Sequence, residues 1–79
     1  MMAQFELPPF GSLNLDVHPQ GDEGYFVIDG ICTVVLPDSH ESIDVFPGQV
    51  FYIKTNEKHI ATNRTNQRVT VLAAIAPEV

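Results

Sequence analysis

The sequence predicts an all-β protein, a small antiparallel sandwich or barrel with no substantial helix. Short apolar segments recur roughly every eight to twelve residues, separated by turn residues, which is the spacing of strands in such folds. No stretch of about ten residues keeps the 3.6-residue period of an amphipathic helix. Asp29-Gly30 lies between two apolar segments, and this dipeptide favours the type I′ turn of a β-hairpin.

The N-terminal segment differs from the rest of the chain. Residues 1–11 contain Pro8-Pro9, which forbids a helix and disfavours a central strand. We therefore expect an extended N-terminal arm over residues 1–11, followed by a β-barrel over residues 12–79. The arm carries three large apolar side chains that need an apolar surface: Phe5, Leu7 and Phe10.

The strands of the barrel follow from alternation and from short apolar runs. Residues 12–18 alternate apolar and polar side chains, which predicts a strand with one buried face. Six further strands are expected over residues 24–28, 31–36, 42–46, 50–53, 58–62 and 69–76. The first two of these six are apolar on both faces, so we place them in the middle of the fold. We expect the following side chains to be buried: Ile28, Val34, Leu36, Val50, Ile53, Val71 and Leu72, with the aromatic residues Tyr25, Phe26, Phe51 and Tyr52.

Length and cysteine content limit what stabilises this domain. A single domain of 79 residues buries only about 60–65% of its unfolded surface, so its core is marginal unless a metal or a partner chain adds to it. Cys32 is the one cysteine of the chain, which rules out an internal disulfide. We expect a reduced, buried thiol and a reducing compartment, and hence a cytoplasmic protein.

The charge balance excludes two classes of partner. Ten acidic residues against four basic ones give a formal net charge of −6, which opposes binding to nucleic acid or to an anionic membrane surface. The sequence shows no secretory signal at its start and no apolar run long enough to span a bilayer. We therefore expect neither a nucleic-acid partner nor a membrane.

Four polar residues on the predicted strands are candidate metal ligands. Asp16 and His18 share one face of the strand over residues 12–18, because side chains repeat every second residue. Glu23 begins the next strand, and His59 lies on a later one. Two imidazoles and one or two carboxylates that converge inside a small barrel suit a divalent metal. Spacing alone leaves open that each histidine is a core or rim residue.

Two motifs resemble those of the cupin family. Residues 16–30 resemble its first motif, HxH(x)3–4E(x)6G, with His18, Glu23 and Gly30 in register. Residues 48–63 resemble its second motif, G(x)5PxG(x)2H(x)3N, through Gly48, His59 and Asn63. This sequence departs from the motifs at three positions: Asp16 replaces the leading histidine, and Lys54 and Asn56 replace the proline and the glycine.

The resemblance implies a small single-domain cupin, a jelly-roll β-barrel with a metal site inside. It assigns the ligands to His18, Glu23 and His59, with Asp16 in the fourth place. It implies a divalent metal (Fe, Mn, Zn or Ni) and a small-molecule ligand that is bound or transformed, since the family includes dioxygenases, sugar isomerases and epimerases, and decarboxylases. The alternative is that Asp16 marks the loss of the site. The chain would then be a non-catalytic, metal-free cupin that acts as a small-molecule sensor or an interaction module.

The arm also predicts a homodimer. If it lies along the sheet of a second copy, it covers an edge strand and buries its phenylalanines. Pairing of small cupins through their sheets points the same way. The competing interpretation is that the arm folds back over the mouth of its own barrel as a lid.

Overall fold

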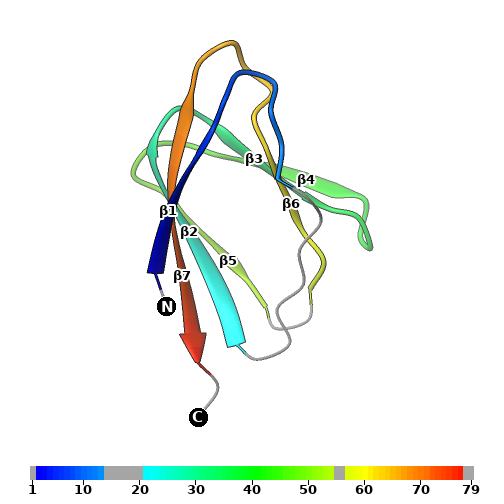
Figure 1. Ribbon diagram of the computed structural model, residues 1–79. Coiled ribbons are helices and arrows are strands. Elements are labelled where there is room, and N and C mark those ends of the chain that lie inside the picture. Colours follow the sequence, from blue (N-terminus) through cyan, green and yellow to red (C-terminus); the bar gives the residue numbers. More distant parts are fainter. Residues whose placement is uncertain (1, 14–20, 55–56, 78–79) are drawn as a thin grey trace.

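The computed structural model describes residues 2–13, 21–54 and 57–77, and the described chain is all-β (Figure 1). The described residues form seven strands in two antiparallel sheets and contain no helix, so none that could cross a bilayer. The predicted all-β class is therefore confirmed. The strands are β1 (Met2–Leu7), β2 (Gly21–Asp29), β3 (Cys32–Leu36), β4 (Glu41–Val45), β5 (Val50–Ile53), β6 (Ile60–Thr62) and β7 (Val69–Pro77).

The two sheets form the layers of a sandwich. One has four strands in the order β1-β7-β2-β5, and the other has three in the order β4-β3-β6. Figure 1 shows the first and last strands of the chain side by side in the four-stranded sheet. A jelly-roll sandwich fits this arrangement. Pairing among the described strands does not join the two sheets into the closed barrel that the sequence analysis expected.

The turn at Asp29-Gly30 is a corner between the sheets and not the predicted hairpin. β2 pairs with β5 and β7, whereas β3 pairs with β4 and β6. A type I′ turn needs positive φ at both central residues. Only Gly30 has it, at 80°, and a bulge between Val27 and Asp29 bends β2 just before the corner. The chain therefore passes from one sheet to the other at Gly30.

In the N-terminal segment, where the sequence analysis expected an extended arm, residues 2–7 form β1 and add a strand to the sheet of the same chain. β1 pairs with β7 along its whole length, from Met2 opposite Ala74 to Leu7 opposite Val69. Alternation along β1 turns Phe5 and Leu7 inward, so that Leu7 is buried in the core and Phe5 packs against it. Phe10 stays exposed. The arm thus places two of its three large apolar side chains on its own sandwich, and the homodimer stays a prediction.

The core lies between the sheets and confirms part of the predicted set. Its buried apolar residues include Val34, Leu36, Ile53 and Val71, as expected, with Tyr25 and Val27 from β2. The prediction is wrong for four side chains, which are between 40 and 64% exposed: Phe26, Ile28, Val50 and Tyr52. Leu72 is only partly buried.

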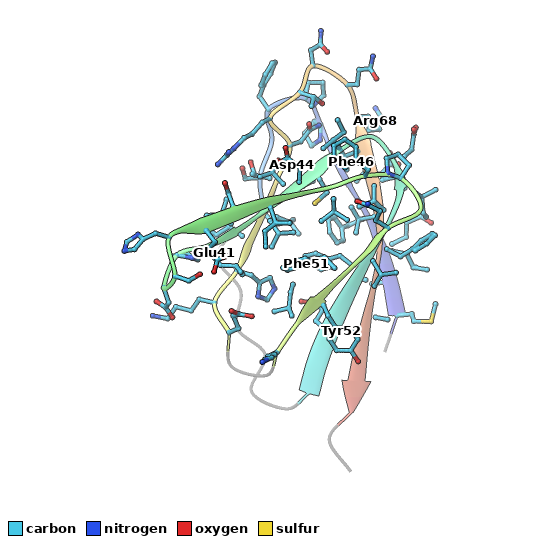
Figure 2. The ribbon with its side chains drawn as sticks, turned by 180° about the vertical axis from the view of Figure 1, so that it is seen from behind. Glu41, Asp44, Phe46, Phe51, Tyr52 and Arg68 are labelled. Carbon is cyan, nitrogen blue, oxygen red and sulfur yellow. The ribbon has the colours of Figure 1, made fainter. Side chains whose placement is uncertain are left out.

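These errors have one cause, which is that β2 and β5 are each covered on one side only. Period-two alternation turns Tyr25 and Val27 into the core and Phe26 and Ile28 out of it. Figure 2 shows the same on β5, where Phe51 and Tyr52 project to opposite sides of the strand. Apolar side chains on both faces of a strand therefore did not mean burial on both faces. The strand predicted over residues 12–18 lies mostly outside the described residues; at its start, Ser12 bridges to Thr62.

Candidate functional site

Glu23 and His59 meet in the interior, between the two sheets. Glu23 lies on β2 opposite Ile53 of β5, and His59 directly precedes β6 of the other sheet. The imidazole Nε2 lies 2.9 Å from the carboxylate Oε1. The side chain of His59 is 1% exposed and that of Glu23 is 6% exposed. Two residues that are 36 positions apart in the sequence thus form a buried polar pair.

The other ring nitrogen of His59 determines how this pair can work. Nδ1 lies 3.0 Å from the backbone carbonyl of Glu57. A carbonyl oxygen only accepts hydrogen bonds, so Nδ1 carries a proton and donates it. In the neutral ring, Nε2 then presents a lone pair to the carboxylate of Glu23. Contact between Nε2 and Oε1 requires a proton or a cation shared by the two atoms, because two electron-rich atoms repel each other at this distance.

The geometry of the pair fits two ligands of one metal ion. Imidazole nitrogen and carboxylate oxygen bind Fe, Mn, Zn and Ni, at about 2.0–2.2 Å for zinc. Two such atoms at roughly right angles around one ion lie about 3 Å apart. The 2.9 Å between Nε2 and Oε1 matches this separation. In metal sites, the histidine nitrogen that does not bind the metal commonly donates its proton to a backbone carbonyl, as Nδ1 of His59 does here.

Aromatic rings enclose the imidazole on one side. The ring of Tyr25 meets His59 edge-on, with centroids 5.8 Å apart and planes at 69°. Phe5 packs on Tyr25 in the same manner, at 5.6 Å. Tyr25 is 2% exposed, so it belongs to the core, as predicted, and also contacts the site. These contacts fix the ring plane of His59 and keep water away from it.

The structure brings together two of the four predicted ligands. Asp16 and His18 lie outside the described residues, so their place at the site stays a prediction. Within the described parts of the chain, no three His, Cys, Asp or Glu side chains come close enough to hold a metal. His40, the remaining histidine, is exposed in the turn between β3 and β4.

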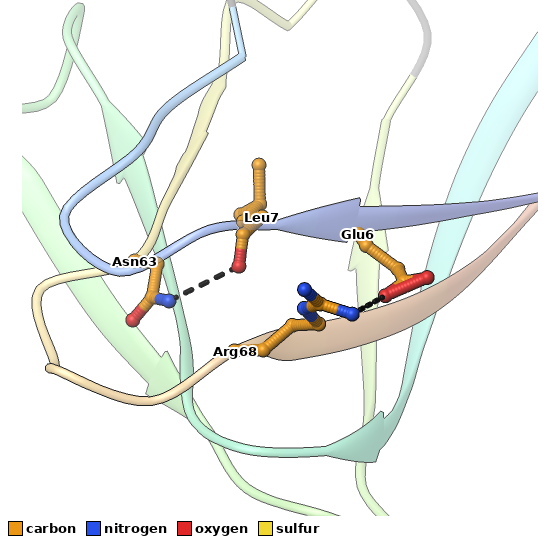
Figure 3. A network of polar contacts seen from close by, with 4 residues as sticks. All are labelled: Glu6, Leu7, Asn63 and Arg68. Atoms are coloured by element: carbon orange, nitrogen blue, oxygen red, sulfur yellow. Dashed lines mark hydrogen bonds and ion pairs between the residues drawn. The ribbon is translucent and has the colours of Figure 1, made fainter.

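Asn63, the last position of the second motif, has a structural role. Its amide nitrogen donates to the carbonyls of Leu7, Pro8 and Gln67 at 3.2, 3.1 and 2.6 Å. Its oxygen accepts from the backbone N–H and the hydroxyl of Thr65. Asn63 thus ties the end of β1 to the loop before β7 (Figure 3). The nearby ion pair of Glu6 and Arg68, at 3.2 Å, is exposed and lies outside the site.

Sequence reasoning missed two partners of His59. Neither the carbonyl of Glu57 nor the ring contact of Tyr25 leaves a signal in the sequence, because both depend on where the backbone places them. Asn63 did leave a signal: Asn-x-Thr at residues 63–65 is typical of a side chain that caps its own turn.

Comparison with known proteins shows the class to which this fold and site belong. Residues 3–75 match the family described as "Cupin domain". The chain therefore belongs to the cupin-domain family, as the two motifs predicted. None of the curated protein sequences matches it significantly.

Solved structures resemble the chain over almost its whole length. A predicted oxalate decarboxylase from Thermotoga maritima matches with 25% identity and a TM-score of 0.87, over 98% of this chain and 65% of its own. The polyketide cyclase RemF from Streptomyces resistomycificus matches with 29% identity and a TM-score of 0.82, over 96% of this chain and 52% of its own. An uncharacterized Klebsiella pneumoniae protein with a double-stranded β-helix domain shares the fold, with a TM-score of 0.88 at 20% identity over 96% of this chain and 65% of its own. The chain thus spans about half to two thirds of the length of these proteins.

Proposed function

We propose that this protein binds a divalent metal between its sheets and uses it to bind or transform a small organic molecule. The buried pair of Glu23 and His59 is the observation that carries the proposal. Glu23 would hold the cation through its carboxylate and His59 through Nε2, and His18 with Asp16 would complete the ligand set from the neighbouring segment. Iron(II), manganese, zinc and nickel all suit these donors.

The residues of the chain prepare the site in three ways. The hydrogen bond from Nδ1 to the carbonyl of Glu57 fixes the tautomer in which Nε2 is free of a proton. Tyr25 holds the plane of the imidazole. Burial of both ligands excludes water and strengthens every electrostatic contact made there. When bound, a divalent metal supplies a Lewis acid that polarises oxygen groups of the ligand.

Two of the similar proteins support a small organic ligand. The names of those with at least 25% identity describe chemistry on oxalate and on a polyketide. Carboxylate and carbonyl oxygens are the donors that a hard or borderline divalent cation with open positions accepts. We therefore expect the ligand to carry such groups. The free, buried thiol of Cys32 fits the cytoplasmic location that we expect.

Metal analysis tests this proposal directly. Protein purified without chelator, and apoprotein incubated with Fe(II), Mn(II), Zn(II) or Ni(II), are desalted and measured by mass spectrometry for metal per chain. We expect about one ion per chain for at least one of the four metals. Glu23→Gln and His59→Ala should each lower affinity at least tenfold, because each removes one donor. His18→Ala and Asp16→Ala test the two ligands that the sequence assigns.

The matched control is His40→Ala, since this histidine is exposed in the turn between β3 and β4. It should leave metal content unchanged. Folded wild-type protein that takes up none of the four metals contradicts the proposal. In that case the metal-free alternative, a sensor or interaction module, describes the chain, and the pair shares a proton instead.

A further inference from the structure

Two aromatic rings connect the N-terminal strand to the buried pair. Phe5 of β1 packs edge-on against Tyr25 of β2, with ring centroids 5.6 Å apart and planes at 74°. Tyr25 in turn meets the imidazole of His59 edge-on, at 5.8 Å. Both contacts have the T-shaped arrangement and the separation that are favourable for aromatic pairs. The three rings thus form a continuous chain from the edge of the four-stranded sheet to a candidate metal ligand.

Strand register explains how rings from β1 and β2 can meet. β7 lies between these two strands, and neighbouring strands are about 4.8 Å apart, so β1 and β2 are about 10 Å apart. On β7, Ala73 pairs with Tyr25 on one side and with Ala3 on the other. The side chain of Ala73 belongs to the core and is small, which leaves the rings of Phe5 and Tyr25 room to meet across β7. Their contact therefore depends on the docking of β1 along β7.

β1 is attached to the sandwich by few contacts. Among the described strands it pairs with β7 alone, at the edge of its sheet (Figure 1). Of its six residues, only Phe5 and Leu7 are not exposed. Edge strands with few buried side chains are among the parts of a fold that open most readily. The ring of Phe5 is therefore a contact that the fold can make or lose without unfolding as a whole.

We propose that Phe5 is a positioning residue for His59 and acts through the ring of Tyr25. The inference rests on the proposed function, in which His59 binds the cation. The hydrogen bond to the carbonyl of Glu57 fixes the tautomer of the imidazole, and the aromatic chain limits its tilt. A side chain that is held in its binding orientation loses less entropy when a ligand binds. Because coupling between two events is reciprocal, a bound metal also strengthens the docking of β1.

Zn(II) affinity of the full chain, measured by competition with a chromophoric chelator, tests this role. Phe5→Leu removes the ring but keeps an apolar side chain on the core, so circular dichroism should show an unchanged fold. It should lower the affinity about threefold to tenfold, which is the range available from one aromatic contact. Phe5→Tyr keeps the ring and should bind Zn(II) as wild type does.

The matched control is Ile43→Ala, which trims another partly buried side chain of the core, from β4 of the other sheet. It should lower stability in urea and leave Zn(II) affinity unchanged. In a Tyr25→Leu background, Phe5→Leu should have no further effect, because the connecting ring is absent. An equal effect of Phe5→Leu in both backgrounds overturns the inference, and so does an equal loss of affinity in Ile43→Ala.

Nuclear magnetic resonance of the apoprotein tests the inference without metal. The imidazole signals of His59 should move in Phe5→Leu and stay in place in Ile43→Ala. Unmoved signals in Phe5→Leu overturn the positioning role even where wild-type protein binds Zn(II). Moved signals in a chain that takes up no metal support this role and overturn the proposed function alone.

Hydrogen exchange tests the coupling to β1. Saturating Zn(II) should slow exchange of the β1 amides in wild-type protein and have little effect on them in Phe5→Leu. Equal slowing in the two proteins contradicts a coupling through the aromatic chain.

Discussion

Asn63 provides the sharpest test of how this small domain is held together. This residue is 1% exposed, and its side chain makes hydrogen bonds both to the end of β1 and to the loop before β7. We predict that Asn63→Ala lowers the free energy of unfolding by about 2–4 kcal/mol. A buried polar group left without a partner costs about 1–3 kcal/mol, and the substitution affects at least two, the carbonyl of Leu7 and the backbone N–H of Thr65.

This loss is large for a domain of 79 residues, whose total stability is about 4–12 kcal/mol. Urea unfolding followed by circular dichroism measures it, since the transition midpoint falls at an unchanged slope. Asn66→Ala, in the same loop but exposed, is the matched control and should cost less than about 0.5 kcal/mol. Equal costs for the two alanine variants would refute the reasoning.

A second substitution at this position separates hydrogen bonding from packing. Asn63→Asp keeps the shape of the side chain and the acceptor for Thr65, but it sets a carboxylate against three carbonyl oxygens. These carbonyls raise the pKa of the introduced carboxyl above its ordinary value of about 3.9 in the folded state. The folded variant then binds more protons than the unfolded chain, so its stability falls as pH rises from about 4 through the raised pKa. A variant as stable as wild type at pH 7 contradicts the assigned direction of these hydrogen bonds.

Two further predictions concern single positions. Gly30→Ala should lower the free energy of unfolding by more than about 2 kcal/mol, and Gly48→Ala by only about 1 kcal/mol. Both glycines have positive φ, so alanine is strained at either position. At Gly30 an added Cβ would also lie 2.7 Å from the Arg68 carbonyl, whereas at Gly48 it would meet nothing within 4 Å. Equal losses in urea unfolding contradict this steric account. Burial raises the pKa of the Cys32 thiol to about 11, so the thiol should not react with a disulfide reagent at pH 8 in native protein and should react fully in urea. Rapid labelling of the native protein would show that this part of β3 opens readily.

The fold was predictable from the sequence as far as local pattern determines it. Strand periodicity identified the all-β class, and two motifs identified the family. The pairing of strands was not predictable at the corner, because Asp29-Gly30 suits a hairpin and a change of sheet equally well until the neighbours of β2 are known. The predicted burial of Ile28 and Val50 was wrong for a similar reason. A strand that is apolar on both sides has the same sequence whether or not a second layer covers its outer side.

Half of the candidate site follows from the sequence and the structure together. The motif spacing selected Glu23 and His59, and the fold brings them to 2.9 Å although they lie on different sheets. The partners that orient the imidazole were beyond sequence reasoning, since a backbone carbonyl such as that of Glu57 has no residue type to recognise. The second motif also identified Asn63, whose side chain does not reach the pair but donates hydrogen bonds to the backbone carbonyls of Leu7 and Pro8.

The buried pair is better explained by chemistry than by stability. The inward positions of β2 run Glu23, Tyr25 and Val27, and those around β6 run His59, Ala61 and Asn63. Apolar residues in place of a buried ion pair are often neutral or stabilising by about 1–4 kcal/mol, since two charges must be desolvated to form the pair. A domain with so small a core would gain stability from two apolar side chains here. Asn63 repays its burial through five polar contacts of its own. The core pattern is therefore broken at two places without a gain in stability, and these two meet, which is what a binding site for a cation requires.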